Sequence, residues 1–381
     1  MARPEKPRLL AVFHSFGQSY MHVPALLQRT GCPVDAVFSQ GHPLRRAKGF
    51  EQSFVVPIDG WVPAIEDLLA SGRYTLLMNV DETGVYSLYD HEWTAPVEDC
   101  LPFSPSSPLA RTVGNKAAFH EWCLAHSLPV PETHAVEDFE SALAFSRTRS
   151  GPWLLKGNRG FGGQRVLAPP FDPPAPEAQA GVWLVQRDHG RRVGSGLFAS
   201  LQGRLAAWMG IQKNVCLRNG FGPTVTGESY SPPAVGELCA AVAAAGGISG
   251  ITGFDFVLTD DERPLIIDSH LGRMSPLQHF DRACGVDLGA ALGAALRNEQ
   301  QPVPKPSTGR EFIKFPECLQ LAFEGRIART TPGRSVYMPL FPENDLPLGV
   351  TSTVHLVMSE VRVWLGAVRR RIFRPPTPRP L

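Results

Sequence analysis

The chain has 381 residues, of which 43% are hydrophobic and 19% are charged. This composition is that of a globular protein rather than a disordered one, and the length predicts two or three domains. The formal net charge is only +1, which argues against nucleic acid as the main partner. The seven cysteines are scattered without a CxxC pair, so the sequence predicts neither a disulfide framework nor a zinc site and favours a reducing cytoplasm.

The first residues predict a β-strand rather than a signal peptide. The charged residues up to Arg8 are followed by only a short apolar run, Leu9–Phe13. The longest uncharged stretch, Leu238–Phe254, is rich in alanine and glycine and is too short for a membrane-spanning helix. We therefore expect a soluble, cytoplasmic protein.

Residues 1–100 alternate between predicted strands and helices. Strands are expected at Leu9–Phe13, Val34–Phe38, Phe54–Pro57 and Tyr74–Met78, and helices at Val23–Arg29 and Val62–Leu69. This order is typical of an α/β domain with a small parallel sheet. A Pro/Ser-rich hinge at Leu101–Pro108 marks the end of this domain.

Residues 101–300 predict a body in two parts. The first part, residues 101–180, contains two predicted helices around the extended segment Pro129–Pro131, then the strand Trp153–Lys156, which enters a glycine-rich loop. The second part, residues 181–300, begins with the strand Val182–Val185 and contains a predicted helix over Pro233–Ala245. A Pro-rich linker then leads into a C-terminal segment, residues 301–381.

Two predicted strands each carry one carboxylate, thirteen positions apart. Asp255 lies in the run Gly253–Leu258 and Asp268 follows Pro264–Ile267, with a turn between the two runs. Because residues i and i+2 of a strand share a face, Asp255, Asp268 and His270 can converge on one point. Such a cluster suits Mg²⁺, which takes one or two carboxylates together with substrate phosphates. The alternatives are two exposed acids at strand ends and a structural or substrate-contacting His270.

The loop after Lys156 contains Gly160, Gly162 and Gly163. Glycines allow backbone amides to approach a phosphate closely, and a lysine on the preceding strand adds positive charge. An ordinary hairpin turn explains the same pattern. No Gly-Lys-Ser/Thr follows, and the next residues lead into prolines instead of a helix, so the loop matches neither a Walker loop nor a Rossmann fingerprint.

The order of these motifs over roughly residues 8–300 resembles the ATP-grasp superfamily, and within it the predicted carboxylate–amine ligases that carry a small α/β domain in front. The matching segments are, in chain order, Asn115–Lys116 with Leu128–Thr133, Trp153–Lys156, Gly160–Val166, Leu184–Asp188, Asn219–Thr224 and Cys284–Leu288. The spacing of Asp255 and Asp268 also matches the family. The resemblance implies an α/β plus α+β fold: a small parallel-sheet N-terminal domain, a two-subdomain ATP-grasp fold and a C-terminal appendage.

The resemblance also implies a reaction and its residues. ATP would bind between the two subdomains with Mg²⁺ on its phosphates, phosphorylate a small-molecule carboxylate, and release ADP and phosphate when an amine or thiol attacks the acyl phosphate. The residues implied to bind the nucleotide are Lys116, Lys156, Gly160, Gly162, Gly163, Gln186, Arg187 and Asp188. Asp255, Asp268 and His270 would hold the metal. Arg273 would stabilise the acyl phosphate or the oxyanion that follows it.

The chain departs from the family pattern at the metal site. Asp268 and His270 stand where the family usually has Glu and Asn. An imidazole suits Mn²⁺ better than Mg²⁺, so Mn²⁺ is the alternative metal. Arg192 stands where an acid that binds the ribose is expected. These changes leave a second hypothesis open, a nucleotide-binding partner without catalytic activity.

Other charged residues near the expected cleft have two interpretations. Lys213 and Arg218 precede the turn at Gly220 and either bind phosphate or are solvated charges. Asp81 and Glu82 follow the last strand of the N-terminal domain and either face the cleft or begin a helix.

Residues 354–374 predict an amphipathic helix with a basic end. The apolar stripe includes Val354, Met358 and Trp364, and three arginines follow at 369–371. Such a helix either packs on its own domain or makes peripheral contact with an anionic membrane. The second alternative would make the protein a membrane-surface ligase acting on a lipid or envelope intermediate. The sequence leaves the two substrates and the oligomeric state open, although the N-terminal domain can offer a homodimer surface.

Overall fold

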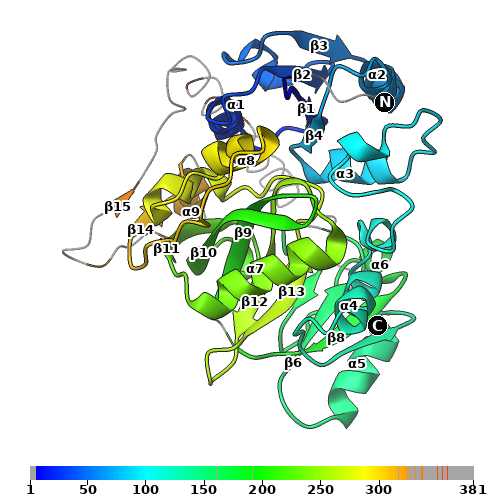
Figure 1. The fold of residues 1–381 in the computed structure, drawn as a ribbon. Coiled ribbons are helices and arrows are strands. Elements are labelled where there is room, and N and C mark those ends of the chain that lie inside the picture. The colour runs from blue at the N-terminus through cyan, green and yellow to red at the C-terminus, as the bar shows by residue number, and fades with distance from the viewer. Residues whose placement is uncertain are drawn as a thin grey trace.

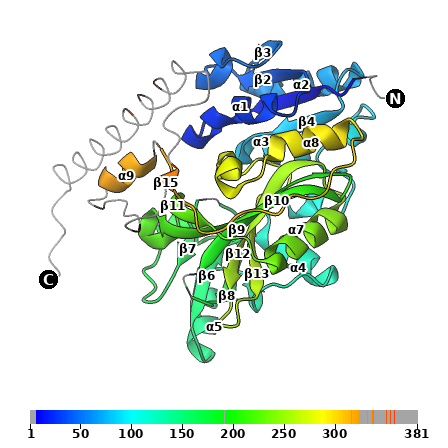
Figure 2. The ribbon, with the colours of Figure 1, turned by 60° about the vertical axis from the view of Figure 1, so that its left-hand side comes forward.

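Three β-sheets organise the chain, and helices cover their faces (Figures 1 and 2). The computed structural model describes residues 6–160, 162–190, 192–315, 317–323, 326, 331, 336–337, 350, 354 and 358. In Figure 1 the N-terminal domain lies at the top, the large sheet in the centre and the small sheet at the lower right.

The N-terminal domain is a four-stranded parallel sheet in the order β3-β2-β1-β4. Its elements are β1 (Leu9–Phe13), α1 (Val23–Gln28), β2 (Val34–Ser39), β3 (Ser53–Val56), α2 (Trp61–Ala70), β4 (Leu76–Asn79) and α3 (Glu82–Tyr89). Every residue of β1 is buried, because Phe13 packs with Leu26 of α1 on one face and Val12 packs with Trp61 of α2 on the other. A strand covered on both faces is a continuous apolar run. The prediction of a small parallel sheet is confirmed.

The small sheet has four antiparallel strands in the order β5-β8-β6-β7. Its elements, with the helices of the same segment, are α4 (Lys116–Ala125), β5 (Thr133–Val136), α5 (Phe139–Thr148), β6 (Trp153–Gly157), β7 (Val166–Leu167), α6 (Pro176–Gln179) and β8 (Trp183–Arg187). Trp153 and Leu155 of β6 pack with Phe139 of α5 in one core. Leu154 and Lys156 alternate with them, so they lie on the opposite face and line the cavity described below.

The large sheet has seven strands in the order β13-β12-β9-β10-β11-β14-β15. Its elements are β9 (Val193–Leu201), β10 (Arg204–Cys216), β11 (Thr224–Ser229), α7 (Pro233–Gly246), β12 (Gly250–Leu258), β13 (Pro264–Ser269), α8 (Leu288–Leu296), β14 (Glu311–Ile313), α9 (Glu317–Phe323) and β15 (Val336–Tyr337). Phe198 packs with α7, whereas its neighbour Leu197 packs with α8 and the N-terminal domain. Figure 1 shows α8 between the large sheet and the N-terminal domain.

The contact between α8 and the N-terminal domain depends on a glycine. A Cβ at Gly293 would lie 1.8 Å from the Thr30 carbonyl oxygen, so no other residue allows this approach. Arg29 extends the contact through ion pairs with Asp281 at 2.6 Å and Asp287 at 3.1 Å. The N-terminal domain is therefore docked on α8 and on the segment that precedes it.

Strands β9, β10 and β11 were not anticipated from the sequence. Seven consecutive residues of β9, Gly194–Ser200, are buried, because α7 covers one face of the strand and α8 covers the other. Such a strand lacks the alternation of apolar and polar residues that indicates a half-exposed sheet.

Two of the predicted domain boundaries fall between strands that pair in the same sheet. Strand β8 lies after residue 180, the predicted end of the first part, yet it pairs with β5 and β6 of the small sheet. Strand β14 lies in the predicted C-terminal segment, yet it pairs with β11 of the large sheet. Pairing between distant segments decides which sheet a strand belongs to, and this pairing cannot be inferred from the composition of the linkers.

The predicted helix over residues 354–374 falls almost wholly outside the described residues. Val354 and Met358 are described, and both have helical backbone and side chains that are about half exposed. None of the helices in the described part of the chain combines the length and the hydropathy that crossing a bilayer requires.

Candidate active site

A cavity of about 1090 Å³ lies where the small sheet, the large sheet and the N-terminal domain meet. Cavities that bind cofactors and small molecules usually measure roughly 300–1,000 Å³. The predicted site residues that line it are Lys156, Gly162, Gly163, Gln186, Arg187, Asp188, Asp255, Asp268, His270 and Arg273. Lys116 lines a small adjoining pocket that shares Asp268 and Arg273 with the cavity. Sequence segments far apart therefore contribute to one site.

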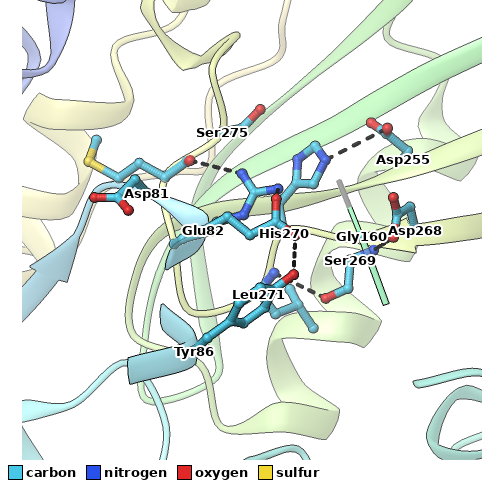
Figure 3. A network of polar contacts seen from close by, with 12 residues as sticks. Asp81, Glu82, Tyr86, Gly160, Asp255, Asp268, Ser269, His270, Leu271 and Ser275 are labelled. Carbon is cyan, nitrogen blue, oxygen red and sulfur yellow. Dashed lines mark hydrogen bonds and ion pairs between the residues drawn. The ribbon is translucent and has the colours of Figure 1, made fainter. Parts of the chain in front are cut away.

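The two predicted metal carboxylates are direct partners in the large sheet. Asp255 of β12 and Asp268 of β13 lie opposite each other in the antiparallel register. His270 follows β13, and its Nε2 lies 3.7 Å from an Asp255 carboxylate oxygen (Figure 3). The His270 Nδ1 is buried and has no hydrogen-bond partner in the described part of the chain. The side chain of Asp255 is 15% exposed, which excludes the interpretation of this residue as a solvated strand-end acid.

Each carboxylate is paired with a lysine. Asp255 binds the Lys213 ammonium at 2.6 Å and accepts a hydrogen bond from the Ser195 hydroxyl at 2.6 Å, and Asp268 binds the Lys116 ammonium at 3.1 Å. Burial alone would raise both carboxyl pKa values. Lys213 and His270 nevertheless hold the pKa of Asp255 well below its usual range, and Lys116 lowers that of Asp268. Both groups are therefore anionic at neutral pH.

The three predicted ligands do not form a ready-made metal cage. Among the described residues, no group of three or more His, Cys, Asp and Glu side chains is arranged to hold a metal ion. The assignment of Asp255, Asp268 and His270 as joint metal ligands stays a prediction.

The two predicted nucleotide lysines approach the site from different elements. Lys116 opens α4, whose N-cap Asn115 accepts a hydrogen bond from the Ala118 amide, and its ammonium also donates to the Gly160 carbonyl at 3.0 Å. Lys156 of β6 is buried, and its ammonium donates to the Gln186 side-chain oxygen at 2.6 Å. Burial lowers the pKa of Lys156 to about 8, although Asp268 opposes the shift.

The glycine-rich loop connects β6 to β7 and docks on the large sheet. Gly160, Gly162 and Gly163 all have positive φ. The Arg218 guanidinium donates to the Gly162 carbonyl at 2.6 Å. A Cβ at Gly163 would lie 1.9 Å from the Phe221 carbonyl oxygen. The loop is thus a hairpin connection between β6 and β7, which is the alternative to a phosphate-binding loop. It nevertheless borders the cavity and contacts the turn at 217–222.

The segment Gln186–Asp188 lies at the end of β8 and lines the cavity from the small sheet. Gln186 turns its side chain toward Lys156, and its amide nitrogen donates to the Thr133 hydroxyl at 3.1 Å. The Arg187 guanidinium is engaged elsewhere, since it donates to the Ser150 carbonyl at 2.7 Å and lies over the Trp153 ring. The structure thus brings Gln186 to the lysine but holds the Arg187 guanidinium against Ser150 and Trp153, next to the start of β6.

Arg273 lies at the end of the cavity formed by the N-terminal domain. Its guanidinium binds the Glu82 carboxylate at 3.1 Å. Burial lowers the pKa of Arg273, but Glu82 and other neighbours raise it above its ordinary value, so the residue stays charged. Asp81 caps the helix that begins at Glu82, as one of the two interpretations predicted, and Glu82 also lines the cavity.

Several residues in the cavity wall or bonded to it were not assigned from the sequence. Ser195 lies opposite Asp255 in the register of β9 and β12, so its position became apparent only with the sheet. Lys314 and Glu317 come from the C-terminal segment and form a buried ion pair at 3.0 Å in the cavity wall. Tyr20 lines the cavity from the N-terminal domain. No local motif marks these residues, because each reaches the site through pairing or packing with elements far away in the chain.

The sequence matches no protein-family profile and no curated protein. The structure, in contrast, is similar to solved structures of several ligases and carboxylases. N5-carboxyaminoimidazole synthase from Aspergillus clavatus, solved with ADP and 5-aminoimidazole ribonucleotide, has a TM-score of 0.61 at 14% identity, covering 80% of this chain and 81% of that chain.

Two further similar structures come from bacteria. The biotin carboxylase domain of the Hydrogenobacter thermophilus 2-oxoglutarate carboxylase, solved with MgADP, ADP and bicarbonate, has a TM-score of 0.55 at 14% identity, with 79% and 73% of the two chains covered. The L-amino acid ligase of Bacillus licheniformis has a TM-score of 0.51 at 14% identity, with 78% and 77% covered. The chain therefore has the ATP-grasp fold, and the predicted fold class is confirmed. At these identities the similarity establishes the fold alone.

Proposed function

We propose that the protein is an ATP-dependent ligase that joins a carboxylate to an amine or related nucleophile through an acyl phosphate. One observation carries the proposal: two lysines and two carboxylates from four separate elements surround a cavity large enough for a nucleotide and a second substrate. The similar proteins solved with ADP, with MgADP and with bicarbonate support the same class of chemistry.

The nucleotide is proposed to bind along the small sheet. Gln186, Arg187 and Asp188 would contact adenine, and Arg187 would do so through its backbone, because its guanidinium donates to the Ser150 carbonyl. Lys156 and Lys116 would neutralise the phosphates, and the backbone amides at Gly162 and Gly163 would cover the transferring group. These residues line the cavity, except Lys116, which lines the adjoining pocket.

Mg²⁺ fits the donor set at Asp255 and Asp268. Two carboxylates directly opposite each other match an ion that binds one or two protein carboxylates and takes its remaining oxygens from phosphates and water. Lys213 and Lys116 balance this negative charge in the structure and would share the carboxylates with the ion. Mg²⁺ held there would neutralise charge on the phosphates during transfer.

The proposed reaction has two steps. A carboxylate oxygen of the acid attacks the γ-phosphorus of ATP, the bond to the β–γ bridging oxygen breaks, and ADP leaves. The amine then attacks the acyl carbon, the C–N bond forms, phosphate leaves with the electrons of the C–O bond, and the amine loses a proton. Arg273 would stabilise the acyl phosphate and the developing oxyanion, as a buried guanidinium can.

Calorimetric titration with ATP in the presence of Mg²⁺, Mn²⁺ or EDTA tests the proposal. We expect metal-dependent binding that Asp268→Asn weakens and that the control Asp261→Asn, in the exposed turn between β12 and β13, leaves unchanged. ADP release in the presence of pooled acids and amines then measures activity. Tight binding without metal and without turnover would favour the non-catalytic alternative, and no binding would refute the proposal.

A further inference from the structure

The N-terminal domain contributes a carboxylate to the site. Glu82 of α3 binds the Arg273 guanidinium at 3.1 Å, although the two residues are 191 positions apart in the chain. The Tyr86 hydroxyl, one helical turn further along α3, donates to the other oxygen of the same carboxylate. Figure 3 shows Glu82 and Tyr86 reaching toward the segment that follows β13. The carboxylate thus has one partner on its own helix and one in the ATP-grasp body.

This ion pair is largely shielded from water. The side chain of Arg273 is 10% exposed and that of Glu82 is 19% exposed, and both residues line the cavity. A buried pair loses much more than an exposed one when one partner is removed, because the other charge is left uncompensated. Asp268 already interacts electrostatically with Arg273. If Glu82 were removed, the Arg273 guanidinium would therefore be drawn toward Asp268.

Backbone and side-chain hydrogen bonds fix α3 relative to Arg273. The Asp81 carboxylate accepts hydrogen bonds from the Gly84 amide, the His14 amide and the Ser15 hydroxyl. The Met274 amide donates to the Asn79 carbonyl at 2.9 Å, which ties the residue after Arg273 to the end of β4. The start of α3 and the segment that carries Arg273 are therefore connected by hydrogen bonds through the end of β4.

We infer that Glu82 is a positioning residue that orients the Arg273 guanidinium toward the transferred phosphoryl group, so that the N-terminal domain completes the catalytic site. This inference rests on the proposed function. Among the described residues, Glu82 makes no hydrogen bond or ion pair with Lys116 or Lys156. It therefore acts on the phosphoryl group through Arg273, whereas the small sheet contacts the rest of the nucleotide. Groups that orient a catalytic or ligand-binding residue typically contribute about 10- to 100-fold.

Binding of inorganic phosphate to the MgADP complex tests this role without knowledge of the acid or the amine. The full-length protein is titrated calorimetrically first with MgADP and then with inorganic phosphate, which is the released product. We expect Glu82→Gln to weaken phosphate binding about 10- to 100-fold and to leave MgADP affinity unchanged within about twofold. Tyr86→Phe, which keeps the carboxylate, should weaken phosphate binding less and in the same direction.

A double-mutant cycle separates positioning from general damage. In an Arg273→Met background, Glu82→Gln should cause no further loss of phosphate affinity, because its only route to the phosphate has been removed. The control is Glu66→Gln, which alters another carboxylate of the N-terminal domain. Glu66 binds His91 and Thr94 away from the cavity, so this variant should change the affinity for neither MgADP nor phosphate.

Four outcomes would overturn the inference. They are equal loss of MgADP and phosphate affinity in Glu82→Gln, unchanged phosphate affinity in that variant, additive losses in the double variant, and a wild-type MgADP complex that binds no phosphate. A wild-type protein that binds no MgADP would refute the proposed function itself, which distinguishes the two failures.

Discussion

Replacing Lys156 with methionine is expected to stabilise the folded protein at neutral pH while weakening nucleotide binding. The lysine is 7% exposed, and the direct partner of its ammonium is the neutral Gln186 side chain. Burial lowers its pKa from the ordinary 10.5 to about 8. The unfolded chain thus binds a proton on this group more tightly than the folded protein does, so the charged lysine opposes folding.

The size and pH range of this effect follow from the two pKa values. At about 1.4 kcal/mol per pH unit, the interval from about 8 to 10.5 costs the folded state about 3 kcal/mol at any pH below 8. The cost disappears as pH rises from 8 to 10.5, because the lysine is then neutral in both states. Methionine removes this cost but leaves the Gln186 oxygen without its donor, a loss of about 1–3 kcal/mol. The variant should gain about 0–2 kcal/mol at pH 7 and become the less stable protein near pH 10.5.

Urea unfolding at several pH values between 7 and 10.5 measures this crossover. The difference in unfolding free energy between Lys156→Met and wild type should change by about 3 kcal/mol across the range. Lys305→Met, which alters an exposed lysine, should give a constant difference. Calorimetry with MgATP should show reduced affinity in Lys156→Met alone. Parallel stability curves for Lys156→Met and wild type would refute the assignment of Lys156 as a buried, destabilising cation.

Two further predictions concern other parts of the molecule. In Gly163→Ala, the new Cβ would lie 1.9 Å from the Phe221 carbonyl oxygen, and the positive φ of residue 163 disfavours alanine. The loop must therefore move, and MgATP affinity should fall at least about tenfold. Gly162→Ala, which meets only the end of a flexible arginine, should lose less, and equal losses would contradict the docking of the loop. His22 stacks on His279, and burial lowers the pKa of both residues, that of His22 to about 4. The His22 contribution alone should lower stability by about 3 kcal/mol as pH drops from 6.5 to 4, where the unfolded chain takes up a proton. His22→Phe should make the decline shallower in urea unfolding, and an unchanged decline would show that His22 does not contribute to it.

Local pattern was sufficient for the elements with a clear periodicity. The run Leu9–Phe13 was predicted as a strand and forms β1 with the same bounds. Asp255 and Asp268 were predicted to lie on neighbouring strands, and they are partners in the register of β12 and β13. The prediction succeeded because a short turn between two apolar runs allows one simple pairing. Strand β9, buried on both faces, offered no such pattern.

The sequence by itself determined the class of fold, the two strands that carry the carboxylates, and the lysine and glycine loop that border the cavity. The class of fold followed from the order of the motifs over roughly residues 8–300. The strands, the lysine and the glycine loop depend on residues close together in the chain, where hydrophobic periodicity and turn chemistry act. Only the tertiary structure decided which charges meet. Lys213 reaches Asp255 across 42 positions, Ser195 reaches it across 60, and Glu82 reaches Arg273 across 191. Such pairings depend on how three sheets pack together, and the free energy that selects them comes from the whole core rather than from the segments that carry the charges.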